Sequence, residues 1–313
     1  QTGGYCYKLV TPSSTPEMQE QVRHIHKSNK DSFILGSGSN SLISDLYWDG
    51  FVISLENLTG IELQDDKIIV HGGVDNSDLS HFALRNNIDG LWWLNGLPGQ
   101  IGATTRMNAR CYGGEISKVV SKITCVTRKG EVIDYNLKEN DTQKVFRGYK
   151  DTIFMGNQQI ITKVEIDAHK LNETEHIKEK MQACLNDRKS KQQYLYPSCG
   201  CVFKNNYHPE VSVPSGRLID ACGLRGVRNG AAQISPMHGN FIYNTGSASS
   251  QEIMELSLHA REKVWDRFGV WLEYEMELLG NFPPKILKRI KERRHTRSKN
   301  LELQSLRKEI NCQ

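Results

Sequence analysis

Short apolar runs and alternating apolar and polar positions predict β-strands along most of the chain. Such stretches are typical of strands when β-branched and aromatic residues lie between turn residues. The predicted strands are 5–10, 33–35, 51–55, 61–63, 67–70, 123–127, 132–135, 159–167, 202–203, 232–234, 241–243 and 270–279. We expect 33–35 to be buried, 123–127 and 132–135 to form a hairpin, and the apolar run 91–94 to be a strand leading into a glycine-rich loop.

Apolar residues three or four positions apart, together with capping residues, predict helices between these strands. The predicted helices are 14–30, 77–87, 172–191 with Asn172 as its cap, 215–222 and 249–269. Ser14 with Glu17 and Ser249 with Glu252 have the spacing of a capping box, and Gly269 suits a left-handed helix end. Helices and strands follow one another in mixed order without an internal repeat, which predicts the α+β class. At 313 residues, two domains are expected.

Two glycine-rich segments combine small residues with backbone donors. The first, Gly-Ser-Gly-Ser-Asn at 36–40, follows an apolar strand and can form an anion-binding nest. In the second, 96–113, glycines and a proline lie where a helix should begin, which favours a phosphate at the helix N-terminus. A separation of about sixty residues does not fit a nucleotide-binding βαβ unit of about thirty residues, but it fits a two-lobed flavin site. A glycine-serine turn alone is equally compatible with an ordinary turn.

Composition is that of an ordinary globular chain. Hydrophobic residues make up 38%, and no run reaches the roughly 18 apolar residues of a membrane span. The N-terminus is polar and lacks the apolar core of a signal peptide, so a cytoplasmic location is expected. The eight cysteines are too scattered for a disulfide scaffold. Cys199 and Cys201 lack the partners that a four-ligand zinc site needs, so no metal is expected.

Positive charge is concentrated at the C-terminus. Residues 281–313 hold ten lysines and arginines against three glutamates, which leaves the preceding 280 residues slightly acidic within a total charge of +4. A basic helical tail of this kind can bind RNA or anionic lipid. The interpretation we favour is a solvated helix or a frayed end, so nucleic acid is not an expected partner.

The order of motifs resembles that of the UDP-N-acetylenolpyruvoylglucosamine reductase (MurB) family, over residues 2–280. The motifs that carry the resemblance are 36–40, Pro98-Gly99 to Asn108-Ala109, Tyr112-Gly113, Tyr149-Lys-Asp-Thr152, 197–205, Gly216-Arg-Leu-Ile-Asp220, Gly223-Leu-Arg-Gly226, Ser235, His238, Asn240, Asn244 and Leu272-Glu-Tyr-Glu275. The short chain between Lys191 and Pro197 resembles the subgroup without the extra tyrosine-bearing loop.

The resemblance implies a fold and a reaction. The fold is a two-lobed FAD-binding domain of the vanillyl-alcohol-oxidase (PCMH) type at 1–168, a smaller C-terminal α+β substrate-binding domain at 169–280, and a basic helical tail at 281–313. The reaction is NADPH-dependent reduction of UDP-N-acetylglucosamine enolpyruvate to UDP-N-acetylmuramate in peptidoglycan precursor synthesis, by a cytoplasmic monomer with non-covalent FAD. The partner it implies is this small-molecule substrate, without membrane insertion.

Three catalytic residues follow from the resemblance. Cys201 occupies the position where most relatives place a proton-donating serine, and a thiol with an ordinary pKa of about 8.5 can serve as the acid. Glu275 matches the family's catalytic glutamate, although Glu273 and Glu277 share its face of the predicted strand and the pattern alone does not choose among them. Lys150 replaces the family's arginine and can offset enolate charge, but it cannot make a two-pronged contact.

The resemblance also assigns binding positions. The cofactor-binding residues are Gly36, Ser37, Gly38, Ser39, Asn40, Pro98, Gly99, Gly102, Asn108, Tyr112 and Gly113, and the substrate-binding residues are Tyr149, Arg188, Lys204, Asn205 and Arg217. Ala103, Arg106, Arg110, Cys111 and Thr152 depart from the family pattern. Arg106 and Arg110 either contact phosphate or face solvent, and Arg147 is a candidate to compensate for Lys150.

Two further hypotheses concern cysteines, and one concerns a histidine. Cys199, on the same predicted strand face as Cys201, allows an inhibitory disulfide between the two. Cys111 lies in the second loop and raises the alternative of an FAD-dependent oxidase acting on a sugar or alcohol, because such oxidases often tether flavin through cysteine or histidine. His238 is expected to be structural and to lie near Asn240.

Overall fold

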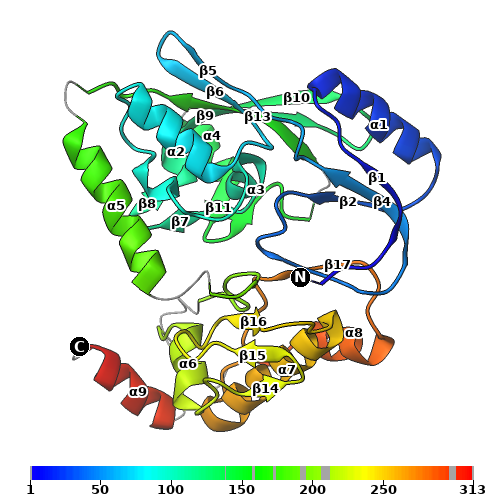
Figure 1. Cartoon of the computed structure of the whole chain (residues 1–313), viewed down its shortest axis with the longest axis vertical. Coiled ribbons are helices and arrows are strands. Elements are labelled where there is room, and N and C mark those ends of the chain that lie inside the picture. The colour runs from blue at the N-terminus through cyan, green and yellow to red at the C-terminus, as the bar shows by residue number, and fades with distance from the viewer. Residues whose placement is uncertain are drawn as a thin grey trace. The chain divides into compact units, whose positions relative to one another are not determined.

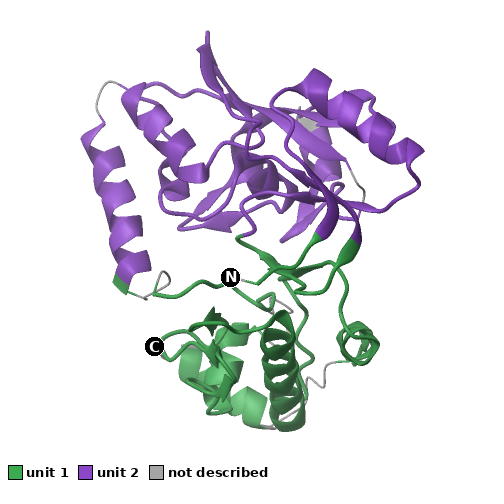
Figure 2. Ribbon diagram, turned by 45° about the vertical axis from the view of Figure 1, so that its right-hand side comes forward, with its two compact units in different colours: residues 1–5, 39–48, 190–313 green, residues 6–38, 49–189 purple. Residues whose placement is uncertain are grey.

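The computed structural model describes residues 2–137, 139–156, 159–171, 174–190, 195–205, 212–295 and 301–311, without the side chains of Glu139, Asn140, Leu301 and Asn311. The chain forms two units (Figure 2). Unit 1 consists of Gln1–Tyr5, Ser39–Trp48 and Ser190–Gln313, and unit 2 of Cys6–Gly38 and Asp49–Lys189. Two short segments from the N-terminal half therefore belong to the unit that holds the C-terminal part of the chain. The domain boundaries expected at residues 168 and 280 remain a prediction.

A five-stranded antiparallel sheet forms the centre of unit 2 (Figure 1). Its strands lie in the order β10 (Val132–Asn136), β9 (Val120–Val126), β13 (Ile160–Asp167), β6 (Lys67–His71) and β5 (Ile61–Gln64). Along β13, Val164 and Ile166 are buried and Glu165 between them is half-buried, which is the alternation expected for a strand with one face on the core. The predicted strands in this region and the predicted hairpin are confirmed.

Helices, tight turns and short strands complete unit 2 around this sheet. They are α2 (Asn76–Arg85), η1 (Trp92–Leu94), α3 (Ile101–Arg106), η2 (Ile116–Lys118), α4 (Glu139–Val145) and α5 (Glu175–Ser190), with the short strands β7 (Arg110–Cys111), β8 (Gly114–Glu115), β11 (Phe146–Gly148) and β12 (Asp151–Thr152). The expectation of a strand at 91–94 is wrong, because Trp93 turns into the core at 1% exposure and its Nε1 donates to the Gly90 carbonyl oxygen at 3.0 Å. The helix predicted at 77–87 is confirmed as α2, with Leu79 and Ala83 buried.

A second sheet in the chain has the order β1 (Cys6–Val10), β4 (Trp48–Ser54) and β2 (Ser32–Leu35), and α1 (Thr15–Lys27) connects β1 to β2. Ser14 caps α1 by accepting the Glu17 N–H at 3.3 Å, but the Glu17 carboxylate binds the N–H and hydroxyl of Ser13. Only half of the predicted capping box therefore forms. The expectation that 33–35 is buried is also wrong: β2 lies at the sheet edge and is half-buried throughout.

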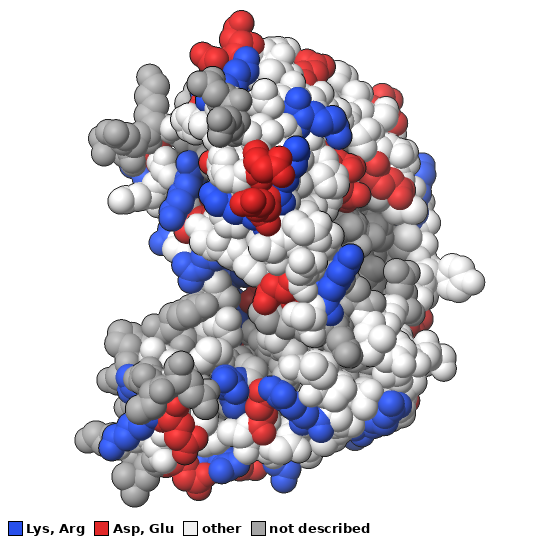
Figure 3. All heavy atoms as spheres, turned by 60° about the vertical axis from the view of Figure 1, so that its left-hand side comes forward, with Lys and Arg blue, Asp and Glu red and all other residues white. Residues whose placement is uncertain are grey.

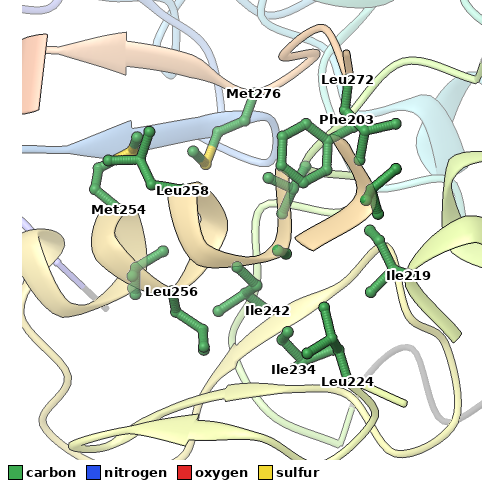
Figure 4. Close-up of a cluster of buried hydrophobic side chains, with 14 of the residues drawn as sticks. Phe203, Ile219, Leu224, Ile234, Ile242, Met254, Leu256, Leu258, Leu272 and Met276 are labelled. Atoms are coloured by element: carbon green, nitrogen blue, oxygen red, sulfur yellow. The ribbon is translucent and has the colours of Figure 1, made fainter. Parts of the chain in front are cut away.

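Unit 1 is built around one long helix. The strands β14 (Arg228–Asn229), β15 (Ala232–Ile234) and β16 (Ile242–Asn244) form an antiparallel sheet, and β17 (Glu277–Leu279) pairs in parallel with β3 (Ser41–Ile43). Two helices, α6 (Ser215–Ala221) and α7 (Ser250–Phe268), pack with them. Figure 4 shows the core, where Met254, Leu256 and Leu258 of α7 lie among buried strand side chains such as Ile242. Both ends of α7 are as predicted: Ser249 and Glu252 form the capping box, and Gly269 ends the helix at φ 67°.

Two predicted strands of unit 1 are wrong in whole or in part. Residues 202–203 form no regular strand and make isolated bridges, Cys201 with Phe241 and Phe203 with Tyr274. Of the predicted strand 270–279, only β17 is regular. Both segments are held by scattered hydrogen bonds from residues that are distant in the sequence. The alternation of apolar and polar residues along a strand does not predict such bonds.

The basic tail packs into the core of unit 1, so the interpretation as a solvated or frayed end is wrong. It contains α8 (Pro284–Lys291) and α9 (Leu301–Asn311). Phe282 and Ile286 are each 5% exposed and Leu303 is 0% exposed, all three in the same cluster as the α7 side chains. Five residues named in the sequence predictions lie outside the described residues: Asn172, Lys191, Arg297, Lys299 and Cys312.

Charge is mixed on the surface that can be seen. On the face drawn in Figure 3, lysine and arginine side chains are interspersed with aspartate and glutamate. Among the helices that the structure describes, none has the length and apolar character needed to cross a bilayer.

Candidate active site

The two glycine-rich segments meet in unit 2, where the first loop lies beside the start of α3. A Cβ atom on Gly36 would lie 3.2 Å from Gln100 Oε1. Gly38 has φ 70°, a left-handed conformation that glycine adopts without strain. Gly102 lies so near the neighbouring backbone that a Cβ would come 3.0 Å from the Gly72 carbonyl oxygen. Backbone from two distant parts of the sequence therefore forms one cradle.

Unpartnered polar atoms are concentrated in this cradle. Seven buried side-chain nitrogen or oxygen atoms have no hydrogen-bond partner among the described residues, and three of them lie between 100 and 108. These are Gln100 Oε1, Thr105 Oγ1 and Asn108 Oδ1. A buried polar atom without a partner costs free energy, so such a group usually marks a ligand or an ordered water. Two amide oxygens that accept and one hydroxyl fit FAD, whose ribityl hydroxyls and flavin N–H offer donors.

Backbone strain marks three of the predicted site residues. Asn108, Tyr112 and Lys150 have φ values of 44°, 51° and 54°. Asparagine tolerates the left-handed region, but tyrosine and lysine are uncommon there and each costs about 1–3 kcal/mol. Asn108 Nδ2 bonds to Glu115 Oε1 at 2.9 Å and to the Gly148 carbonyl oxygen at 3.3 Å, which joins the second loop to the hairpin that carries Lys150.

The hairpin formed by β11 and β12 is fixed to the end of α3. Thr152 Oγ1 donates to the Arg106 carbonyl oxygen at 2.6 Å and accepts the Phe154 N–H at 3.2 Å. Arg147 bonds to Asp151 Oδ1 at 2.7 Å and to the Thr152 carbonyl oxygen at 2.8 Å. Arg147 therefore stabilises its own hairpin, and its predicted part in compensating for Lys150 gains no support from these contacts.

Cationic side chains gather beside the second loop. The Arg188 side chain is 5% exposed; its Nη2 lies 3.3 Å from Cys111 Sγ and its Cζ 4.9 Å from the centre of the Tyr112 ring. The Arg110 guanidinium lies 4.3 Å from the Tyr149 ring. Burial raises the pKa of the Cys111 thiol, against the opposing charges of Arg188 and Lys150. The site is thus suited to an anion, and Cys111 is a poor nucleophile for tethering flavin.

In unit 1, the segment that carries Cys201 is held by a buried asparagine. Asn240 is 1% exposed, and its side-chain amide pairs with the Phe203 backbone by accepting the N–H at 3.0 Å and donating to the carbonyl oxygen at 2.7 Å. The Asn240 carbonyl oxygen accepts the Val202 N–H at 2.9 Å. Gly200, at φ 73°, turns the chain just before Cys201. The expected alternation that would place Cys199 and Cys201 on one strand face is therefore wrong.

The segment that carries Glu275 lies beside that of Cys201. The N–H groups of Glu275 and Met276 both bond to the Val202 carbonyl oxygen, at 2.9 and 3.2 Å. Two successive donors on one acceptor are typical of a β-bulge. The bulge interrupts the alternation, so the expectation that Glu273, Glu275 and Glu277 share one strand face is wrong.

Asn40, predicted to bind cofactor, also holds the Glu275 segment. Its Nδ2 donates to the Glu275 carbonyl oxygen at 3.0 Å, and its own carbonyl oxygen accepts the Glu277 N–H at 2.9 Å. The preceding residue, Ser39, places its carbonyl oxygen 3.8 Å from where a Cβ on Gly200 would lie. The second half of the first glycine-rich loop is therefore part of the framework around Cys201 and Glu275.

Cys199 is a poor partner for a disulfide. None of the seven cysteines in the described part of the chain is bonded in one. Burial raises the pKa of the Cys199 thiol to about 12, and the Glu275 carboxylate adds to this rise. Because the thiolate is the form that reacts, we expect Cys199 to oxidise slowly.

The remaining predicted residues of unit 1 lie around the same framework. Lys204 Nζ is 3.9 Å from Glu273 Oε2. Asn205 Oδ1 accepts the Ser215 N–H at 3.3 Å at the start of α6, and Arg217 is exposed on that helix. His238 lies near Asn240 as expected, since its Nδ1 accepts the Asn240 N–H at 3.2 Å.

The predicted site residues divide between the two units. Unit 2 contains Gly36, Ser37, Gly38, Pro98, Gly99, Gly102, Asn108, Tyr112, Gly113, Tyr149, Lys150 and Arg188, and unit 1 contains Ser39, Asn40, Cys201, Lys204, Asn205, Arg217 and Glu275. Gln100 and the clamp made by Asn240 were not predicted from the sequence. A polar residue at a helix start and an asparagine beside an apolar strand are the signals in the sequence that point to them.

Comparison with known proteins decides the family. Residues 8–136 match the model of an FAD binding domain, and residues 191–279 match that of the UDP-N-acetylenolpyruvoylglucosamine reductase C-terminal domain. A UDP-N-acetylenolpyruvoylglucosamine reductase of Borrelia garinii subsp. bavariensis is 38% identical over 279 residues, 89% of each chain. The chain belongs to the UDP-N-acetylenolpyruvoylglucosamine reductase (MurB) family.

Further members agree with this assignment. The MurB family reductase of Clostridium tetani is 33% identical over 282 residues, which cover 89% of this chain and 87% of the relative. The crystal structure of MurB from Thermus caldophilus superposes with a TM-score of 0.70 at 28% identity, covering 87% of this chain and 91% of that one. The predicted α+β fold, with an FAD-binding domain followed by a C-terminal MurB family domain, is confirmed. The C-terminal family model ends at residue 279, before the basic tail.

Proposed function

We propose that this protein catalyses the NADPH-dependent reduction of UDP-N-acetylglucosamine enolpyruvate to UDP-N-acetylmuramate, with non-covalently bound FAD, in peptidoglycan precursor synthesis. The observation that carries the proposal is the set of unpartnered buried acceptors at 100–108 beside the Gly36 loop. It occurs in a member of a family whose relatives are named as reductases of this enolpyruvyl sugar nucleotide.

Unit 2 would hold the cofactor. The backbone N–H groups around Gly36, Gly38 and Gly99 would face phosphate oxygens, and Gln100 and Asn108 would offer amide groups. When bound, FAD supplies two-electron transfer between NADPH and the enolpyruvyl double bond. The raised pKa of Cys111 favours a cofactor that is bound without a covalent tether.

Three side chains would handle the proton and the charge. Reduction at the methylene carbon leaves negative charge on the carbon beside the substrate carboxylate. The Cys201 thiol would donate a proton to that carbon, with Glu275 as the second catalytic group. Lys150 would offset the enolate charge, since an ammonium group favours the charge that develops during the reaction.

Charged and polar side chains would bind the substrate. Arg188 and Arg217 would contact the diphosphate or carboxylate, and Lys204, Asn205 and Tyr149 would complete the contacts. The protein would act in the cytoplasm as a monomer of the subgroup without the extra tyrosine-bearing loop. Its domains would be 1–168, 169–280 and 281–313.

A direct assay tests the reaction. In the presence of FAD and UDP-N-acetylglucosamine enolpyruvate, we expect the protein to oxidise NADPH, followed at the nicotinamide absorption band, with one NADPH consumed per substrate reduced. Acid precipitation should release FAD into the supernatant. Oxygen-dependent peroxide formation from a sugar or alcohol, without NADPH oxidation by the enolpyruvyl substrate, would instead support the oxidase alternative.

The cradle predicts an effect on cofactor affinity for Gln100→Ala. We expect the dissociation constant for FAD to rise about tenfold, equivalent to about 1.4 kcal/mol. The midpoint of thermal unfolding of the cofactor-free protein should not fall, because the Oε1 atom has no partner to lose. The matched control is Ser80→Ala, which removes another buried, unpartnered oxygen from α2 outside the cradle. Equal FAD affinity in the two variants would contradict the assignment.

A further inference from the structure

A buried arginine connects the basic tail to the core of unit 1. Arg261 lies in α7 and is 1% exposed. Its terminal nitrogens donate to the carbonyl oxygens of Arg289 and, at 3.3 Å, Ile290, in the last turn of α8. These carbonyls form the negative end of the α8 dipole, which stabilises a cation. Since a buried charge is costly without compensation, the tail completes the site of Arg261.

The same guanidinium lies within cation–π distance of two aromatic rings. Its Cζ is 4.3 Å from the centre of the Trp271 ring and 4.8 Å from that of Tyr274. Trp271 also contacts the tail directly, because its Nε1 donates to the Glu292 carbonyl oxygen at 3.0 Å. The cation–π attraction to the guanidinium adds to the packing that holds each ring.

Tyr274 connects Arg261 to the segments that carry Glu275 and Cys201. It directly precedes Glu275, and its ring centre lies 4.9 Å from that of Phe203, two residues after Cys201. The Tyr274 and Ser257 hydroxyl oxygens are 3.0 Å apart, which ties the ring to α7. The backbone between Gly269 and β17 forms no regular strand, so these side-chain contacts add to the few backbone hydrogen bonds that hold it.

We propose that Arg261 is a positioning residue for Glu275, and that the tail helix α8, which lies beyond the part of the chain shared with the family's C-terminal domain, is needed to hold it in place. The proposal rests on the reductase function proposed above. The α8 carbonyl oxygens hold the Arg261 guanidinium, and the guanidinium holds the Tyr274 ring. Tyr274 in turn directly precedes Glu275 in the backbone. In this way a segment outside the catalytic domain determines how well the carboxylate is placed for the second half-reaction.

Substitutions of Arg261 distinguish a loss of Glu275 positioning from a general loss of protein stability. In Arg261→Met, we expect hydrogen exchange in a peptide covering 270–276 to become faster, while peptides of unit 2 are unchanged. In single-turnover experiments, reduction of FAD by NADPH should keep its rate. Reoxidation by the enolpyruvyl substrate should slow by about 10- to 100-fold, the scale expected for a misplacement of about 1 Å. Arg261→Lys keeps the charge for the α8 carbonyls but loses the planar stack, so it should fold normally and show a smaller effect of the same kind.

Arg267→Met provides the matched control on the same helix. Arg267 bonds to Glu302 of α9 and to the Ala221 carbonyl oxygen, so the variant loosens the tail away from Tyr274. We expect it to leave exchange at 270–276 and both half-reactions unchanged. Unchanged exchange at 270–276 in both Arg261 variants, or equal slowing of the two half-reactions, would overturn the proposal. Failure of the wild-type protein to use the enolpyruvyl substrate would refute the proposed function instead, and the exchange experiment would still decide the positioning.

Discussion

Replacing Cys201 by alanine is expected to slow reoxidation of the reduced enzyme by the enolpyruvyl substrate about 10²- to 10⁴-fold, the range for loss of a general acid. The reason is that alanine has no proton to deliver to the carbon beside the substrate carboxylate. Reduction of FAD by NADPH requires no such proton and should keep its rate. Stopped-flow measurement of flavin absorbance in the two half-reactions checks both statements.

Two variants serve as controls for this prediction. Cys201→Ser restores a hydroxyl at the position where most of the family has one, and it should retain activity. Cys199→Ala removes a neighbouring thiol whose pKa is raised to about 12 by burial, and it should leave both half-reactions near the wild-type rates. A Cys201→Ala protein that reoxidises as fast as the wild type would refute the proton-donor assignment.

Glu275→Gln is expected to slow the same half-reaction by about 10²-fold or more. The substitution keeps the size and the hydrogen-bonding shape of the side chain but removes its charge. The backbone bonds from Glu275 to Val202 and from Asn40 to Glu275 do not involve the carboxylate and should persist. The measurement is the rate of reoxidation together with substrate affinity, because loss of a catalytic group lowers the rate and leaves the affinity nearly unchanged.

Glu273→Gln is the control that the sequence itself suggests. Glu273 lies two residues away, and its carboxylate is more than half exposed and faces Lys204 at 3.9 Å. An exposed ion pair of this kind contributes about 0–1 kcal/mol, so we expect less than a tenfold effect. If Glu273→Gln slowed reoxidation more than Glu275→Gln, the catalytic glutamate would be at 273 instead.

Elements with strong local patterns were predictable from the sequence. The strand pair β9 and β10 follows from apolar alternation around a short glycine-containing turn. Both ends of α7 follow from a capping box and a glycine, whose interactions lie within a few residues of the helix itself. Local hydrogen bonds decide these features, so the local sequence contains the information.

Features that depend on distant partners were not predictable in this way. The Val202 carbonyl oxygen accepts two N–H groups from a segment more than seventy residues away, and this bulge changes which glutamates share a face. Trp93 turns into a core that residues from several strands and helices build, and a run that resembles a strand becomes a 3₁₀ turn.

The sequence by itself determined the family, the α+β class, the glycine-rich segments and the identity of the residues proposed for chemistry, because residue type and spacing carry that information directly. Only the tertiary structure decided that Gln100 lies beside Gly36, that Asn40 and Asn240 hold the segments of Glu275 and Cys201, and that apolar side chains of the basic tail are buried. The physical reason is that the burial of a residue and its hydrogen-bond partners depend on the second surface that packs against it. A helix rich in lysine and arginine becomes part of a core only when another surface covers its apolar face.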